Sequence, residues 1–351
     1  MLKTDILIVG AGPAGTYLAE KLASKGIDTT IIEKKKEIGK HACSGLVSTR
    51  INDFVKIDNS LIENKIKGST FHSKNTSFTI KRQDTQAYVL NRPAFDRFMA
   101  DRAKSSGAKL LTGISFESYH TKDGRVYTKT DKETIQSKII VGCDGAGSVV
   151  RKASGLNTGK KQQVSGILGY TDEKNNSDLV ELFYGKDIAP GFFAWKIPRG
   201  ERTEYGLASD RDHIGHFNRF IAEHNIKIDK TYTHPICFGI IDKTAADNIL
   251  LLGDAALQVK PFSGGGIIYS FLCADIASEV IVKAVEDNNF TSSALNDYDR
   301  QWKSRLAEKI ELGLGIRKTL NSLSDTELVT FFSILSKSRK DIERFGDMDF
   351  L

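Results

Sequence analysis

The sequence contains little cysteine and no long apolar run. No stretch of about 18 or more uncharged apolar residues occurs, so we expect no membrane-spanning helix. The N-terminus lacks the charged and apolar regions of a signal peptide. The four cysteines are scattered, without a CxxC pair or a metal-ligand spacing, at Cys43, Cys143, Cys237 and Cys273. This pattern predicts a reducing, cytoplasmic setting and no metal site.

Strongly basic blocks, internal repeats and low-complexity segments are also missing. The net charge of +6, from 50 basic and 44 acidic residues, is mild. We therefore expect no nucleic-acid partner. The small positive excess suits an acidic or phosphorylated partner, or peripheral contact with the inner, anionic face of a membrane. With 351 residues, 40% of them hydrophobic and 27% charged, the chain is long enough for two globular domains.

A strand–helix–strand unit opens the chain. The apolar run over 5–9 predicts a buried parallel strand, and the helical spacing over 13–25 predicts a helix that Gly26 ends. A second apolar strand follows over 29–32. These three elements form a βαβ unit within about thirty residues.

A GxGxxG pattern lies between the first strand and the helix. Gly10 permits a tight turn, Gly12 lets the backbone approach a pyrophosphate, and Gly15 lets the helix pack on the strand. Glu33, 18 residues past Gly15, is placed to accept ribose hydroxyls, which argues against NADP. The context predicts a Rossmann-type dinucleotide site. Its expected contact residues are Gly10, Gly12, Pro13, Ala14, Gly15, Glu33 and Lys34.

β-rich and helical segments alternate along the rest of the chain. We expect antiparallel strands over 51–89, a helix over 92–106, two strands over 109–127 and a buried strand over 137–142. Further expectations are a β-rich region over 155–240 with one helix near 213–224, a buried strand over 248–253, a helix ending near 286, and a helical tail from 292 with a capping box at 324–327. Rossmann elements therefore recur at three places.

We predict an α/β fold in which a Rossmann-type dinucleotide-binding domain is interrupted by an antiparallel-sheet substrate domain, with a helical C-terminal tail. The expected dinucleotide-binding domain comprises 1–55, 85–155 and 241–290. The substrate domain comprises 56–84 and 156–240, and the helical region 291–351.

Two further segments identify the dinucleotide as FAD, through their resemblance to a known superfamily. Residues 139–151, with Asp144, resemble the DG motif of FAD-dependent hydroxylases of the p-hydroxybenzoate hydroxylase-like superfamily, and residues 248–256, with Asp254, resemble their GD motif. The resemblance implies that Asp254 contacts the ribityl chain and that Arg92 reaches the phosphates. Asp144 could instead be a solvated turn aspartate, and Arg92 an exposed residue at a helix start.

Three glycines open the helix that follows the GD motif. Gly264, Gly265 and Gly266, followed by Ile267, would expose backbone N–H groups and stabilise negative charge on reduced flavin. A plain helix cap is the alternative.

Three segments resemble the geranylgeranyl reductase family, flavoproteins that saturate isoprenoid chains, including those of archaeal ether lipids. They are a cysteine loop at 39–48, the sequence PFSGGGI at 261–267, and the segment 191–198, which is similar to a YxWxFP motif. Phe193 and Ile197 depart from that motif, and the chain is shorter than many members. The resemblance implies FAD contacts for Ala42, Cys43, Gly45 and Phe116, and substrate contacts for Phe193, Trp195, Ile197, Pro198 and Phe262.

Cys43 is the candidate catalytic residue. Reduction of an unactivated C=C bond needs a hydride and a proton, and a cysteine near flavin could donate the proton or position the ring. Cys43 could instead be a small buried thiol, and Trp195 an ordinary core aromatic residue. The neighbouring His41 could lower the thiol pKa, although an ordinary loop histidine is the simpler interpretation.

The sequence therefore predicts an FAD-dependent reductase of geranylgeranyl chains of membrane ether lipids or prenyl diphosphates. No second GxGxxG pattern occurs, so the electrons would come from transient NAD(P)H, a ferredoxin or a reduced deazaflavin. Two alternatives stay open. Residues 195–198 partly resemble the halogenase WxWxIP motif, which keeps an aromatic monooxygenase or halogenase possible, and a non-catalytic flavoprotein is the other alternative.

Overall fold

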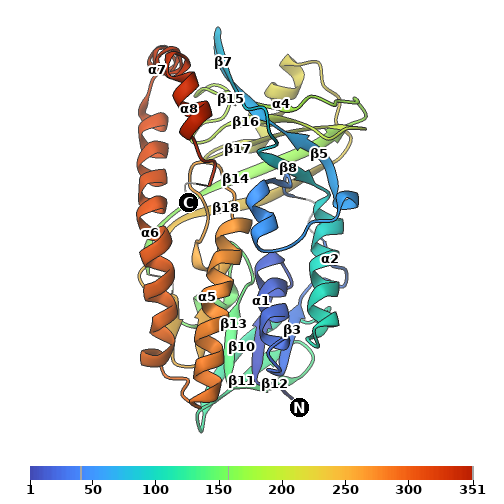
Figure 1. Cartoon of the computed structure of the whole chain (residues 1–351), viewed down its shortest axis with the longest axis vertical. Coiled ribbons are helices and arrows are strands. Elements are labelled where there is room, and N and C mark those ends of the chain that lie inside the picture. Colours follow the sequence, from blue (N-terminus) through green and yellow to red (C-terminus); the bar gives the residue numbers. More distant parts are fainter. Residues whose placement is uncertain (40–41, 157, 350–351) are drawn as a thin grey trace. The chain divides into compact units, whose positions relative to one another are not determined.

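The computed structural model describes residues 1–39, 42–156 and 158–349 (Figure 1). The chain forms two compact units, each built from three segments. Unit 1 comprises 1–40, 93–162 and 237–312, and unit 2 comprises 41–92, 163–236 and 313–351. Among the described residues, no helix is both long enough and apolar enough to cross a membrane.

A six-stranded sheet forms the centre of unit 1. Its order is β19 (Ala245–Ala246), β20 (Ile249–Leu251), β13 (Ile139–Gly142), β2 (Ile6–Val9), β3 (Thr29–Glu33) and β9 (Lys109–Thr112). All its pairs are parallel except β19–β20. Every residue of β2, β13 and β20 is buried, as expected for parallel strands covered on both faces. The predicted strand–helix–strand unit at the start of the chain is confirmed.

A smaller sheet packs against the first through a shared core. Its order is β1 (Leu2–Lys3), β12 (Thr134–Ser137), β11 (Arg125–Thr130) and β10 (Phe116–Lys122). The core between the sheets includes Leu7, Val126 and Ile135. The two strands predicted over 109–127, joined by a turn at 122–124, are confirmed as the hairpin of β10 and β11. The prediction missed a third strand, because Gly113, with φ +68°, breaks the segment and β9 joins a different sheet from β10.

Helices complete unit 1. They are α1 (Pro13–Ala23), α3 (Val149–Ala153) and α5 (Ile267–Glu286), with the 3-10 turn η3 (Gly253–Ala256). Helix α2 (Arg92–Ser105) belongs to unit 1 from residue 93, and α6 (Ser292–Ser322) belongs to it up to residue 312. Helices α1 and α5 lie side by side (Figure 1), and Tyr17 of α1 stacks on Phe271 of α5 with ring centroids 4.3 Å apart. The fully buried Trp302 holds α6 in place, since its indole N–H donates to the Thr244 hydroxyl at 2.8 Å.

A seven-stranded sheet dominates unit 2. Its order is β18 (Thr231–Ile241), β14 (Gly159–Thr171), β17 (Thr203–Ser209), β16 (Ala194–Pro198), β15 (Leu179–Tyr184), β6 (Gly68–Ser73) and β7 (Thr76–Lys81). The β15–β6 pair is parallel, which the prediction of a purely antiparallel sheet missed. Helix α4 (His213–Glu223) covers one face through Phe217 and Phe220.

A three-stranded sheet and two C-terminal helices complete unit 2. The sheet contains β4 (Leu46–Ser48), β8 (Ala87–Leu90) and β5 (Ile62–Ile66), with the 3-10 turns η1 (Thr49–Asp53) and η2 (Asn59–Leu61) nearby in sequence. Phe332 of helix α7 (Asp325–Lys337) packs edge-on against Phe78 of β7, with ring centroids 5.3 Å apart. Helix α8 (Arg339–Phe345) follows. The predicted capping box, Ser324 with Glu327, is confirmed.

The predicted α/β fold class is confirmed, while the compact units have bounds different from the predicted domains. Residues 41–55 and 85–92 cluster with unit 2, because β4 and β8 pair with each other and with β5. Residues 291–312 cluster with unit 1. The assignment of an FAD-binding domain and a substrate domain to these segments stays a prediction.

Candidate functional site

The turn between β2 and α1 requires glycine at two of its positions. Gly10 has φ +108°, and a Cβ atom there would lie 2.4 Å from the carbonyl oxygen of Cys143. A Cβ atom on Gly15 would lie 2.1 Å from the carbonyl oxygen of Gly10 and 3.1 Å from the Ile8 side chain. Strand and helix therefore approach too closely for any side chain, as the motif predicts.

Gly12 differs, because a Cβ atom there would meet no atom within 4 Å. It caps the N-terminus of α1, with Pro13 at the first turn. The first-turn N–H groups have no partner inside the helix, and the helix dipole places positive charge at this end. Open space beside such a terminus fits a pyrophosphate. Ala14 faces the neighbouring motif, since its Cβ lies 3.0 Å from where a Cβ of Gly253 would be.

The Glu33 carboxylate is held at the end of β3 by two backbone amides. The N–H of Ala11 donates to Oε2 and the N–H of Lys35 donates to Oε1, each at 3.0 Å. A carboxylate oxygen can accept more than one hydrogen bond, so both oxygens keep capacity for ribose hydroxyls. The neighbouring Lys34 is exposed.

Asp254 lies against the glycine run that opens α5. A Cβ atom on Gly266, the N-cap of α5, would be 2.9 Å from Asp254 Oδ1. Gly264 has φ +73°, a left-handed conformation that favours glycine. The structure therefore brings the GD aspartate and the glycine run together within unit 1. Ile267 begins α5, and Phe262 just before the run is half-buried.

Asp144 serves as a helix cap. Its carboxylate accepts hydrogen bonds from the Ser148 hydroxyl at 2.5 Å and from the backbone N–H groups of Val149 and Val150 at 2.7 and 3.1 Å. These contacts satisfy backbone N–H groups in the first turn of α3. The FAD contact predicted for Asp144 stays a prediction. Phe116, also predicted to contact FAD, packs in the core of unit 1 with Leu7, which gives it a packing role.

Two residues that were not predicted from the sequence form hydrogen bonds within and between the motifs of unit 1. The fully buried Arg151 donates to the carbonyl oxygens of Ala146 at 2.9 Å and Ala255 at 2.7 Å, linking the DG and GD segments, and burial lowers the pKa of its guanidinium. The buried Gln258 accepts from the N–H of Gly253 at 2.8 Å. Their signal is a polar residue within an apolar, glycine-rich segment.

The cysteine loop belongs to unit 2. Cys43 is half-buried, and Nη1 of Arg92 donates to its sulfur at 2.7 Å. The backbone around it is constrained, because Gly45 has φ +68° and a Cβ atom there would lie 2.3 Å from the carbonyl oxygen of Leu90. Ala42 is half-buried, and His41 lies outside the described residues. Arg92 was predicted to hold FAD phosphates, whereas the structure shows a contact with the thiol.

A buried charge cluster, Glu63–Arg199–Glu204, was also missed. The Arg199 guanidinium donates to Glu63, to Glu204 at 2.8–2.9 Å and to the carbonyl oxygen of Ser44. Glu204 also accepts from the Trp195 indole at 2.8 Å. Arg199 therefore connects the residue after Cys43 with the predicted substrate segment. Its signal is an arginine that directly follows an apolar strand.

The aromatic segment is buried within unit 2. Phe193 stacks on Phe192, with centroids 4.2 Å apart, and meets Trp195 edge-on at 6.1 Å. The Trp195 indole covers Gly206 of the neighbouring strand, where a Cβ atom would lie 2.2 Å from the ring. Ile197 and Pro198 are also buried. These contacts establish a core position, and substrate contact stays a prediction.

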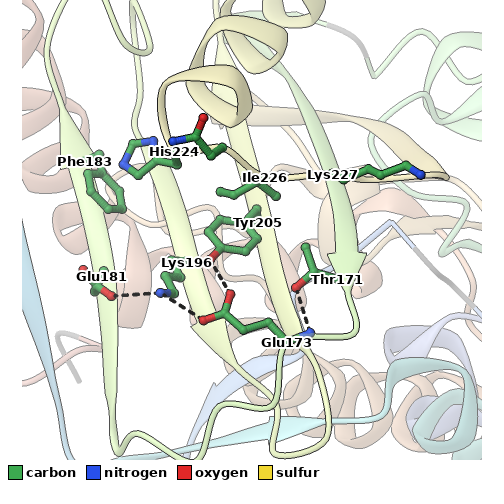
Figure 2. Close-up of a pocket in the computed structure, with 10 residues that line it drawn as sticks. Thr171, Glu173, Glu181, Phe183, Lys196, Tyr205, His224, Ile226 and Lys227 are labelled. Carbon is green, nitrogen blue, oxygen red and sulfur yellow. Dashed lines mark hydrogen bonds and ion pairs between the residues drawn. The ribbon is translucent and has the colours of Figure 1, made fainter.

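Lys196 of β16 lines a cavity of about 450 Å³ (Figure 2). Because strand residues alternate between faces, the neighbouring Trp195 lies on the other face of the sheet. The Lys196 ammonium lies 3.7 Å from Glu173 and 3.8 Å from Glu181, and the hydrogen bond from His72 lowers the pKa of the Glu181 carboxyl. None of the predicted site residues lines this cavity.

The model of a family described as "FAD binding domain" matches residues 3–205, more than half of the chain. A digeranylgeranylglycerophospholipid reductase from Methanocaldococcus jannaschii is 31% identical, over 97% of this chain and 92% of the relative. The chain belongs to this reductase family. A digeranylgeranylglycerophospholipid reductase from Methanosarcina acetivorans is 29% identical, over 98% of this chain and 91% of the relative.

Solved structures agree with that assignment. A geranylgeranyl bacteriochlorophyll reductase-like protein from Thermoplasma acidophilum superposes with a TM-score of 0.90 at 25% identity, covering 96% of this chain and 92% of that one. The flavin-dependent halogenase CmlS has a TM-score of 0.70 at 18% identity, over 87% of this chain and 62% of its own, which shows the shared fold alone. FAD is the cofactor of this reductase family member, and the glycine turn, Glu33 and Asp254 fit it.

Proposed function

We propose that this protein saturates C=C bonds in the geranylgeranyl chains of glycerophospholipids. The observation that carries the proposal is the likeness to a digeranylgeranylglycerophospholipid reductase over nearly the full length of both chains. The proposal is also supported by the fit of the unit 1 motifs to FAD and by the half-buried Cys43, which contacts Arg92 in unit 2. Halogenases share the fold at lower similarity.

In this proposal, the residues of unit 1 hold the cofactor. Gly10, Gly12, Pro13, Ala14 and Gly15 at the start of α1 would bind the pyrophosphate, Glu33 the ribose, and Asp254 with the run 264–266 the remainder of FAD. Once reduced by the external electron donor, bound FAD would supply the hydride for alkene reduction. Lys34 and Ile267 flank these groups in the sequence.

Cys43 is the proposed proton donor. Saturation adds a hydride to one alkene carbon and a proton to the other, so the S–H bond breaks as the new C–H bond forms and leaves a thiolate. Arg92, whose Nη1 donates to the sulfur at 2.7 Å, would stabilise that thiolate until a proton from water restores the thiol. The phosphate contact expected of Arg92 from the resemblance stays a prediction beside this role.

The proposed substrate contacts are apolar. Phe193, Trp195, Ile197, Pro198 and Phe262 would contact an isoprenoid chain, which offers no hydrogen-bonding group. Phe193 in place of the usual tyrosine removes a hydroxyl and is compatible with that role. The indole N–H of Trp195 is already satisfied by Glu204, so its ring can present an apolar face.

Two partners complete the proposal. Electrons come from an external reductant, namely NAD(P)H, a ferredoxin or a reduced deazaflavin. Because the substrate is a membrane lipid, the protein contacts the cytoplasmic membrane face peripherally. Exposed apolar side chains on α7 and α8 support such contact, since Ile334 is 57% exposed and Phe345 is 72% exposed.

An anaerobic half-reaction tests the function. The FAD-loaded protein is reduced with dithionite and mixed with a geranylgeranyl glycerophospholipid in detergent micelles, and a lipid with saturated chains serves as the control. We expect flavin absorbance to return with the unsaturated lipid only, and mass spectrometry to show one added H₂ per reduced bond. A flavin that stays reduced beside an unchanged lipid would reject the proposal, and oxygen-dependent hydroxylation would favour a monooxygenase.

A further inference from the structure

Each glycine of the run 264–266 is needed for a different structural reason, either its backbone conformation or the space that a neighbouring side chain occupies. Gly264 has a positive φ, and Gly266 makes room for the Asp254 carboxylate. Gly265 makes room for Lys260, because a Cβ atom there would lie 2.8 Å from Lys260 Cε and 3.3 Å from its Nζ. At the start of α5, the Asp254 carboxylate therefore lies beside Gly266 and the Lys260 ammonium lies beside Gly265.

The backbone fixes Lys260 at this position. The N–H of Lys260 donates to the carbonyl oxygen of Gly265 at 3.0 Å, and the N–H of Gly264 donates to the carbonyl oxygen of Lys260 at 2.9 Å. These two bonds close a small loop, over which the lysine side chain folds. Lys260 is only 6% exposed. Water therefore screens the ammonium charge only weakly, so this charge can act on a group bound at the start of α5.

We propose that Lys260 sets the reduction potential of the bound FAD by compensating the negative charge that the cofactor gains on reduction. Two electrons and one proton add one net negative charge to the flavin ring of FAD, which is neutral when oxidised. The nearby Asp254 carboxylate opposes that charge, while the α5 N-terminus and Lys260 favour it. This inference rests on the placement of FAD at 264–266 in the proposed function.

The expected effect has a definite sign. Removing the cation disfavours the reduced, anionic flavin ring more than the oxidised ring, which is neutral. We expect Lys260→Met to lower the preference of the protein for reduced over oxidised FAD by about tenfold, which is a potential about 30 mV more negative for a two-electron couple. The affinity for oxidised FAD should change much less, because the oxidised ring is neutral.

The experiment is an anaerobic redox titration of the holoenzyme against an indicator dye, with dithionite as the reductant. Lys260→Arg keeps the charge and should keep the potential near that of the parent. Lys25→Met is the matched control, because Lys25 is exposed beyond the far end of α1, whose 11 residues span about 16 Å. This control removes the same charge and should leave the potential unchanged.

Lys260→Gln provides a second neutral variant in case the methionine variant loses FAD or fails to fold. A potential that is unchanged in a neutral variant with normal FAD binding would overturn the inference while leaving alkene reduction intact. An equal shift in Lys25→Met would also overturn it, because a general charge effect would then explain the result. Conversely, a selective shift at Lys260 stands even where the lipid is not reduced, so the two proposals fail separately.

Discussion

Replacing Arg199 with methionine would leave the buried carboxylate of Glu204 without its ion-pair partner in unit 2. The Arg199 side chain is 1% exposed, and Glu204, which it contacts at 2.8 Å, is fully buried. Burial disfavours the guanidinium charge, but Glu204 and Glu63 outweigh this and raise the pKa of Arg199. Removing one partner of a buried ion pair costs about 3–5 kcal/mol. Glu63 contributes less, because it is partly exposed and keeps Arg202 at 2.9 Å.

We therefore expect Arg199→Met to lower the free energy of unfolding by about 3–5 kcal/mol, measured by urea denaturation. The double variant Arg199→Met/Glu204→Gln removes the stranded charge while retaining an acceptor for the Trp195 indole, so it should recover much of the loss. Arg202→Met is the matched control. Arg202 contacts the same Glu63 but is 38% exposed, and its loss should cost less than about 1 kcal/mol.

The same variant reports on the cysteine loop. Arg199 donates to the carbonyl oxygen of Ser44, so its removal should loosen the loop and speed the alkylation of Cys43 by iodoacetamide under native conditions. Arg202→Met should leave the alkylation rate unchanged. The reasoning is refuted if Arg199→Met and Arg202→Met lose equal stability, or if neither changes the reactivity of Cys43.

Three further predictions follow from the site. Cys43→Ala should retain FAD and slow alkene reduction, measured by anaerobic flavin reoxidation, and unchanged turnover would remove Cys43 from the mechanism. Gly15→Ala should cost at least about 2 kcal/mol of stability because its Cβ meets backbone, whereas Gly12→Ala should fold normally yet weaken FAD binding at least tenfold, measured by calorimetry; equal behaviour of the two would contradict this. Because its folded pKa is lowered, Glu181 stabilises the protein above its unfolded pKa, so the loss of stability in Glu181→Gln should shrink as pH falls below about 4. A difference that is constant with pH would refute that assignment.

The elements near the N-terminus could be predicted because their signals are local. Glycine spacing, an apolar run and a following acidic residue fix β2, α1 and β3, and the capping box at Ser324 is equally local. In contrast, β1 contains two residues, too few for a periodic pattern, and exists only because it pairs with β12. Alternation predicts strands, but it does not say which sheet β9 or β10 will join.

The buried arginines could not be predicted because their partners are far away in sequence. Arg199 contacts Glu63 across 136 positions, and Arg151 contacts Ala255 across 104. In the sequence, each arginine resembles a solvated residue at the end of an apolar element. Only the fold shows that each guanidinium replaces water with carbonyl or carboxylate oxygens, and that these bonds join motifs which the sequence identified separately.

The placement of cations fits the chemistry of an apolar substrate. An isoprenoid chain offers no polar group, so the protein gains little by placing charge against it. The charge changes instead on the two donors, because Cys43 would become a thiolate and the reduced cofactor would lose its anionic charge as the hydride leaves. Each compact unit contains a buried cation beside its own donor site, namely Arg92 at Cys43 and Lys260 at Gly265. Neutralising Arg92 should therefore lower kcat for alkene reduction while leaving the KM for the lipid nearly unchanged, because Arg92 is not proposed to bind the chain. Neutralising Lys260 should not slow the alkene-reducing half-reaction, because a more negative potential makes the reduced cofactor a stronger hydride donor.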